Sequence, residues 1–136
     1  MTPIFQNKHW VVERDAVRPL LVVRRTPEPY AVVGEVEASF RPMEQALDGA
    51  DRRALVLLLD MRAAPFRNDI DFETAANTHP QRFARGFLRM AVLVRTAAGR
   101  LQAQRYFRQR GLEIAAFTEE IEATSLLLAP PSSRRR

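Results

Sequence analysis

Side chains that could carry out catalysis are present in this sequence, but each familiar arrangement lacks a component that its chemistry needs. A serine nucleophile of the hydrolase type stands in a Gly-x-Ser-x-Gly turn, and none of the four serines does. The chain contains no cysteine, which excludes a thiolate nucleophile and a cysteine metal cage. His9 and His79 lie seventy residues apart, without a second histidine at helical spacing, so we expect no metal site. The five glycines are too widely spaced for a phosphate-binding loop. We therefore expect a protein that is not an enzyme and that uses no cofactor.

Three acids do cluster, at Asp69, Asp71 and Glu73. Two carboxylates in one site can act as general acid and general base. Acids at alternate positions in the first turn of a helix point in different directions, however, and they favour the helix by offsetting its dipole. We favour this structural role for the cluster.

A long basic stretch follows these acids. Between Glu73 and Glu113 the chain has no acidic residue but eight arginines. Such a stretch can bind an acidic partner, a phosphorylated group or nucleic acid, but it can also be a solvated face, which we favour. The formal net charge is +5, and the three C-terminal arginines supply three of these units, so the rest of the chain is only weakly basic. The candidate basic patch consists of Arg82, Arg85, Arg95, Arg100, Arg105 and Arg108.

The elements that would position these residues alternate along the chain. Short apolar or β-branched runs predict strands, the first two forming a hairpin, at residues 10–14, 20–24, 54–59, 90–94 and 114–117. Apolar residues at steps of three and four predict a helix over 31–48, which Pro42 should kink or shorten. A second helix should begin at Asn68 or Asp69, a third should span 97–110 with Thr96 as its cap, and Thr118 should cap the last. This order predicts an α/β fold whose mostly parallel central sheet has helices packed against it.

One domain accounts for nearly the whole chain. A length of 136 residues suits a single hydrophobic core, so we expect one domain over residues 1–128. The remaining segment, 129–136, contains two prolines, two serines and three arginines, which predicts a disordered tail. No signal-peptide pattern and no apolar stretch of membrane-spanning length occurs. We expect a cytoplasmic protein without membrane insertion.

Several strings, taken together with the order of elements, resemble the STAS family, whose fold is that of the bacterial anti-sigma-factor antagonists (SpoIIAA-like proteins). The strings are RALVLLLD at residues 53–60, VRTAAGRL at 94–101, GLEI at 111–114 and FTEE at 117–120. The resemblance covers about residues 9–128. In more detail, Asp60-Met61-Arg62 with Arg67-Asn68-Asp69 is similar to a divergent branch of small STAS/SEC14-like proteins. The resemblance implies a STAS-like fold with an N-terminal hairpin, and a regulatory role exerted through a protein partner.

The sequence departs from the family at one functional position. Regulatory STAS domains carry a phosphorylatable hydroxyl residue where their second helix begins, but residues 67–71 read RNDID, without serine or threonine. The serine phospho-switch is therefore not carried over. Asp69 either mimics a permanently charged state there or only caps the helix.

These observations predict a non-enzymatic protein-interaction module that acts in bacterial regulation. A homodimer is one arrangement open to it. A helix N-terminus presents unpaired N–H groups to an acidic or phosphorylated partner, so the predicted contact residues are Arg62, Arg67, Asn68 and Asp69. One alternative is a SEC14-like module for a small molecule or lipid, with a cavity lined by Phe40, Phe66, Phe72, Phe83 and Phe87. The other is a nucleic-acid-binding protein that uses the arginines of residues 82–110.

Overall fold

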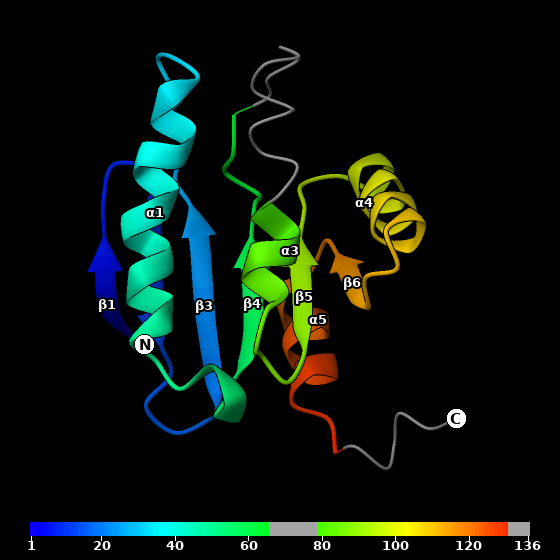
Figure 1. The fold of residues 1–136 in the computed structure, drawn as a ribbon. Helices are drawn as coiled ribbons and strands as arrows, with labels where there is room; N and C mark the ends of the chain where they lie inside the picture. The colour runs from blue at the N-terminus through cyan, green and yellow to red at the C-terminus, as the bar shows by residue number, and fades with distance from the viewer. Residues whose placement is uncertain (66–78, 131–136) are drawn as a thin grey trace.

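The computed structural model describes residues 1–65 and 79–130. In this part of the chain, six strands form one sheet in the order β1-β2-β3-β4-β5-β6 (Figure 1). The first three strands are antiparallel, and β3 to β6 are parallel. The strands are β1 (Thr2–Gln6), β2 (Trp10–Arg14), β3 (Leu20–Arg25), β4 (Val56–Asp60), β5 (Met90–Leu93) and β6 (Ile114–Phe117). The α-helices are α1 (Gly34–Asp48), α3 (His79–Ala84), α4 (Ala97–Gln109) and α5 (Glu120–Leu127), and a 3₁₀ turn spans Arg52–Ala54.

The two faces of the sheet are covered differently. Strands β3 to β6 are parallel and lie side by side in sequence order. Right-handed crossovers between such strands place all the connecting helices on one side of the sheet. Accordingly α1, α3 and α4 lie on one face, and α5 lies on the other (Figure 1). We call these the helical face and the α5 face. Successive side chains of a strand point to opposite faces, so Leu57 and Leu59 pack on the helical face while Val56 and Leu58 pack beneath α5.

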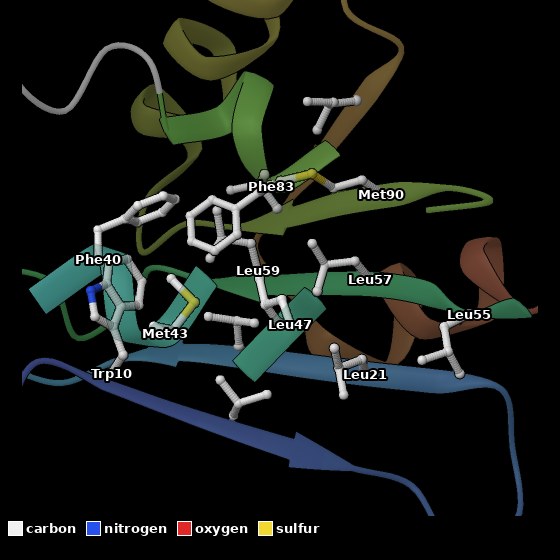
Figure 2. Close-up of a cluster of buried hydrophobic side chains, with 14 of the residues drawn as sticks. Trp10, Leu21, Phe40, Met43, Leu47, Leu55, Leu57, Leu59, Phe83 and Met90 are labelled. Atoms are coloured by element: carbon white, nitrogen blue, oxygen red, sulfur yellow. The ribbon is translucent and has the colours of Figure 1, made fainter. Parts of the chain in front are cut away.

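The larger core lies on the helical face (Figure 2). Three aromatic rings meet edge to face there, with centroids 6.4 Å apart for Trp10 and Phe40, 5.6 Å for Trp10 and Phe83, and 5.0 Å for Phe40 and Phe83. This geometry is the one that aromatic quadrupoles favour. The contacts tie β2 to α1 and α3, and so fix the carboxyl ends of the central strands.

The fold class predicted from the sequence is confirmed. The hairpin, the later strands and helix α4 lie within about two residues of the predicted ranges. Thr96 does cap α4, because its Oγ1 accepts a hydrogen bond of 2.9 Å from the N–H of Gly99. Gly111, just beyond the helix, has a φ of +67°, which glycine adopts without strain.

Three local predictions were incomplete or wrong. Strand β1 was not predicted, because its short run contains Pro3 and its side chains are mostly exposed. The helix around Pro42 is continuous from Gly34 to Asp48. Pro42 lies on the exposed side of the helix, where water can satisfy the backbone carbonyl that the proline leaves unpaired. Thr118 does not cap α5, whose N-cap is Glu119 without a side-chain hydrogen bond.

Two predictions fall on other parts of the chain. The start of the second helix, at Asn68 or Asp69, and the residues 131–136 of the predicted tail lie outside the described residues. The tail prediction included Ala129, whose carbonyl accepts a 2.6 Å hydrogen bond from Arg89 Nη1.

Within the described ranges, no helix has both the length and the apolar character needed to cross a membrane.

Candidate functional site

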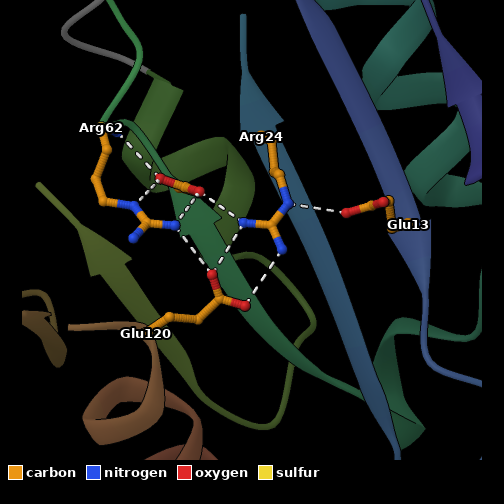
Figure 3. Close-up of polar contacts among 5 residues, drawn as sticks. Glu13, Arg24, Arg62 and Glu120 are labelled. Carbon is orange, nitrogen blue, oxygen red and sulfur yellow. Dashed lines mark hydrogen bonds and ion pairs between the residues drawn. The ribbon is translucent and has the colours of Figure 1, made fainter. Parts of the chain in front are cut away.

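A charged cluster lies on the α5 face, at the carboxyl edge of the parallel strands (Figure 3). Arg24, near the end of β3, is paired in register with Asp60, the last residue of β4. The Arg24 guanidinium donates from Nη1 to Asp60 Oδ2 at 2.6 Å and from Nε to Glu13 Oε1, on β2, at 2.8 Å. Three neighbouring strands thus contribute one charged side chain each, with Glu13 placed diagonally from Arg24, opposite Val22.

Two further residues complete this cluster, which we call the carboxyl-edge network. Glu120, in the first turn of α5, accepts hydrogen bonds of 3.2 Å from Arg24 Nη1 and Nη2. Arg62 donates from Nε to Asp60 Oδ1 at 3.0 Å and from Nη2 to Asp60 Oδ2 at 2.9 Å, and the same Nη2 contacts Glu120 Oε1 at 3.0 Å. The network consists of Glu13, Arg24, Asp60, Arg62 and Glu120.

The charges in the network stabilise one another. Burial disfavours the charged form of Asp60, but hydrogen bonds from Arg62 and Arg24 outweigh burial and hold the pKa of Asp60 below its usual value. Hydrogen bonds from Arg24 likewise lower the pKa of Glu120. For Arg24, burial acts to lower the pKa, but the hydrogen bonds that it donates to Glu120, Glu13 and Asp60 overcome this effect and raise the pKa. Asp60, Glu120 and Arg24 are therefore ionised at neutral pH.

The carboxyl-edge network joins β2, β3, β4 and α5, and its geometry does not suit catalysis. A general base needs a carboxylate whose lone pairs can reach a substrate proton, yet the oxygens of Asp60 are occupied by guanidinium donors and its side chain is nearly buried. In the described residues, no three histidine, aspartate or glutamate side chains are grouped closely enough to hold a metal ion. Arg62 and Glu120 are the most exposed members, each with 38% of its side chain accessible, and Nη1 of Arg62 has no hydrogen bond to a described residue.

Of the four predicted contact residues, the structure places Arg62 in this network. Arg67, Asn68 and Asp69 lie outside the described residues. The sequence interpretation did not identify Glu13, Arg24 or Glu120 as site residues. A signal was available for Arg24, because alternation along β3 puts a charged side chain on the same face as the buried Leu20 and Val22.

The arginines of the predicted basic patch have different surroundings. Arg82, in α3, donates to Glu37 at 3.0 Å and to Glu44, both on α1, and its Cζ lies 4.3 Å from the centroid of the Phe40 ring. Arg100 covers the free edge of β6, where its Nε donates to the carbonyl of Ala116 at 3.1 Å. Beside it, Gln104 Oε1 accepts from the N–H of Ala116 at 2.7 Å. Arg82 and Arg100 therefore make contacts within the protein that hold elements of the fold together.

The other four arginines of that patch are exposed. Arg95 donates from Nη2 to the carbonyl of Ala64 at 3.3 Å. Arg85, Arg105 and Arg108 have no ion pair with a described residue. Whether they act together as a binding patch stays a prediction.

An apolar pocket of about 380 Å³ lies between α4 and the helical face of the sheet. Its walls include Trp10, Leu59, Met61, Phe83 and Tyr106, and none of the described residues that line it carries a charge. Of the five phenylalanines predicted to line a cavity, Phe83 does so, Phe40 is in the core, Phe87 packs beside the core, and Phe66 and Phe72 are outside the described residues.

Comparison with known proteins identifies the fold. No model of a known protein family matches the sequence, and no curated protein matches it. A solved structure does match: an uncharacterised protein of the DUF3478 family from Shewanella loihica PV-4, described as having a SpoIIAA-like fold. The two chains share 16% sequence identity with a TM-score of 0.62, over 91% of this chain and 98% of the other. The protein therefore has an α/β fold of the SpoIIAA-like, or STAS, type, as its sequence predicted.

Proposed function

We propose that this protein is a non-enzymatic protein-interaction module of the STAS type, acting in regulation in a bacterial cytoplasm, and that it binds its partner through the carboxyl edge of the sheet around Arg62. The observation that carries this proposal is the carboxyl-edge network. Open α/β sheets bind their ligands at this edge. Here three carboxylates and two guanidinium groups pair with one another, and Nη1 of Arg62 has no hydrogen bond to a described residue. An acidic side chain of a partner is the group that such a donor would bind.

The proposal also specifies how the module is regulated. Residues 67–71 contain no hydroxyl side chain, so phosphorylation at the start of the second helix cannot switch binding on or off. The carboxylate of Asp69 instead supplies a fixed negative charge.

Two variants test the role of Arg62. Partners are first captured by crosslinking in cells of the source organism and identified by mass spectrometry, and the affinity of the purified pair is then measured by calorimetry. Arg62→Gln removes a charge-assisted contact worth about 1.5–3 kcal/mol, so we expect affinity to fall about tenfold or more. Arg108→Gln, which removes an exposed arginine without an ion pair in the described chain, should bind like the parent. Equal affinity for parent and Arg62→Gln would refute the assignment of this surface.

A second function is favoured by the apolar pocket beneath α4. Its volume of about 380 Å³ falls in the range that small-molecule sites occupy. The uncharged walls fit an uncharged apolar ligand, which is the SEC14-like alternative. Ala103→Trp would fill this pocket from α4. Native mass spectrometry of protein from its source organism should show a bound small molecule that Ala103→Trp lacks, and a ligand-free parent protein would eliminate this alternative.

A further inference from the structure

The guanidinium of Arg25 is buried on the helical face, where no carboxylate of the described residues pairs with it. Arg25 ends β3 and is paired in register with Trp10 on β2. Only 4% of the residue is exposed. Its Nη1 donates to the carbonyl oxygen and to Oγ1 of Thr26, and its Cζ lies 4.5 Å from the centroid of the Tyr30 ring and 5.7 Å from that of Trp10. Among the described residues it forms no ion pair.

A buried cation without a counterion is unfavourable, because it has lost its hydration without gaining an opposite charge. Contacts with the faces of Trp10 and Tyr30 offset part of this loss. Burial nevertheless lowers the pKa of Arg25, which indicates that its surroundings do not fully replace water. The hydroxyl of Tyr30, through a hydrogen bond, and the exposed Glu28, from beyond ion-pair distance, act in the opposite direction on the pKa of Arg25.

Two more polar atoms beside Arg25 are buried without a hydrogen-bond partner: Trp10 Nε1 and His9 Nε2. Trp10 is 2% exposed and His9 is 3% exposed. The His9 ring stacks on Tyr30 with centroids 4.4 Å apart and an interplanar angle of 30°. Native proteins leave few buried polar atoms unpaired, so two such atoms beside one unpaired cation require an explanation.

The backbone holds these side chains in fixed positions. Asn7 Oδ1 accepts hydrogen bonds from the backbone N–H groups of His9, at 2.9 Å, and Trp10, at 2.8 Å. Thr26 N–H donates to the carbonyl of His9 at 2.9 Å, and Thr26 Oγ1 donates to the carbonyl of Lys8 at 2.7 Å. The start of β2 and the end of β3 are thus locked together, as a preorganised binding site requires.

We propose that Arg25, Trp10 and His9 form a binding site for a small oxyanion, a phosphate or a carboxylate, which Tyr30 covers. A guanidinium fork and an indole N–H are donors that match oxyanion oxygens. Tyr30 lies on residues 26–33, the loop between β3 and α1, and its hydroxyl accepts a 3.2 Å hydrogen bond from Ser39 Oγ. Movement of this ring would open the site, which lies on the opposite face of the sheet from the carboxyl-edge network.

Binding at this site should depend on pH through His9. Burial and the charge of Arg25 lower the pKa of His9, with Lys8 acting in the same direction and Glu35 against it. His9 is therefore neutral at pH 7. A bound anion would favour its protonated form, so acetate, whose own charge is constant above pH 6, should bind more tightly at pH 6 than at pH 8.

The single tryptophan of the chain makes the test direct, because the Trp10 indole N–H gives one nuclear magnetic resonance signal. The protein is titrated with sodium phosphate, with sodium acetate and, at equal ionic strength, with sodium chloride. We expect a saturable shift of the indole signal with at least one oxyanion and none with chloride. A response to phosphate alone assigns the site to phosphate groups, and a response to acetate assigns it to carboxylates. The absence of a saturable shift with both oxyanions at millimolar concentrations would overturn the proposal.

Two variants check the residues involved. Arg25→Gln should lose the shift, while Arg108→Gln, which removes the same charge elsewhere, should retain it. His9→Phe keeps an aromatic ring on Tyr30 and should remove the pH dependence of acetate binding. Phosphate binding should keep only the dependence that comes from the phosphate's own change of charge. Both measurements remain possible if Arg25→Gln does not fold. An unchanged response in Arg25→Gln, or in His9→Phe, would contradict the site.

Discussion

Arg24 and Arg25 are consecutive residues of β3 that lie in opposite electrostatic environments. The alternation of the strand sends Arg24 to the α5 face, where Glu13, Asp60 and Glu120 contact it. Arg25 points to the helical face, where aromatic rings surround it. The first arginine holds the carboxyl edge together, and the second is buried without an ion pair to a described residue.

Removing the central carboxylate of the network should destabilise the fold. Asp60→Asn removes the more buried of the two carboxylates that Arg24 and Arg62 share, and we expect a loss of about 2–3 kcal/mol in the free energy of unfolding. Asp48→Asn is the matched control, because the side chain of Asp48 is 66% exposed and its ion pair with Arg52 should contribute less than about 1 kcal/mol. Urea unfolding measures both, and equal losses would show that the network is no more than surface charge.

Acid should weaken the fold through the same groups. The pKa values of Asp60 and Glu120 are lower in the folded protein than in the unfolded chain, so the unfolded chain binds protons first as pH falls. Their stabilising contribution is complete above about pH 5 and is lost as pH falls toward the lowered pKa values. In urea unfolding between pH 7 and pH 3, Asp60→Asn should show a smaller fall than the parent. Parallel curves for the two proteins would contradict this assignment.

The central strand should not tolerate a charge. Leu57 is fully buried on the helical face, so Leu57→Asp places an unpaired carboxylate in the core and should prevent folding. Leu101→Asp introduces the same charge at an exposed position of α4, where 64% of the leucine is accessible, and should fold normally. Circular dichroism distinguishes the two outcomes, and a cooperatively folded Leu57→Asp variant would be inconsistent with the sheet described.

The two threonines before α4 and α5 should behave differently. Thr96→Ala removes the hydrogen bond to the Gly99 N–H and should cost about 1 kcal/mol. Thr118→Ala removes no capping bond and should leave the melting temperature nearly unchanged. Comparable losses in both variants would mean that the cap at Thr96 contributes little.

The sequence was sufficient to predict the fold because its strongest signals are local. Apolar runs such as residues 54–59 and the cap at Thr96 need only neighbouring residues to be recognised. Strand β1 gave no such signal, since an edge strand with few buried side chains lacks apolar alternation. Its position depends on pairing with β2.

The candidate site was less accessible to sequence analysis. Arg24 and Glu120 are ninety-six residues apart in sequence, and their contact depends on how α5 packs beneath the sheet. Arg62 was predicted from its position after the central strand, but its carboxylate partners were not. The apolar pocket was expected to be lined by phenylalanines, yet Trp10, Met61 and Tyr106 contribute to it from distant elements.

The position of the partner on the sheet is the central claim, and amide hydrogen exchange of the complex tests it most directly. In the complex with the captured partner, exchange should slow at residues 61–65, which carry Arg62 at the carboxyl edge. Exchange should be unchanged at residues 85–89, at the amino edge, where Leu88 is exposed. Protection at residues 85–89 without protection at 61–65 would contradict the proposed binding surface.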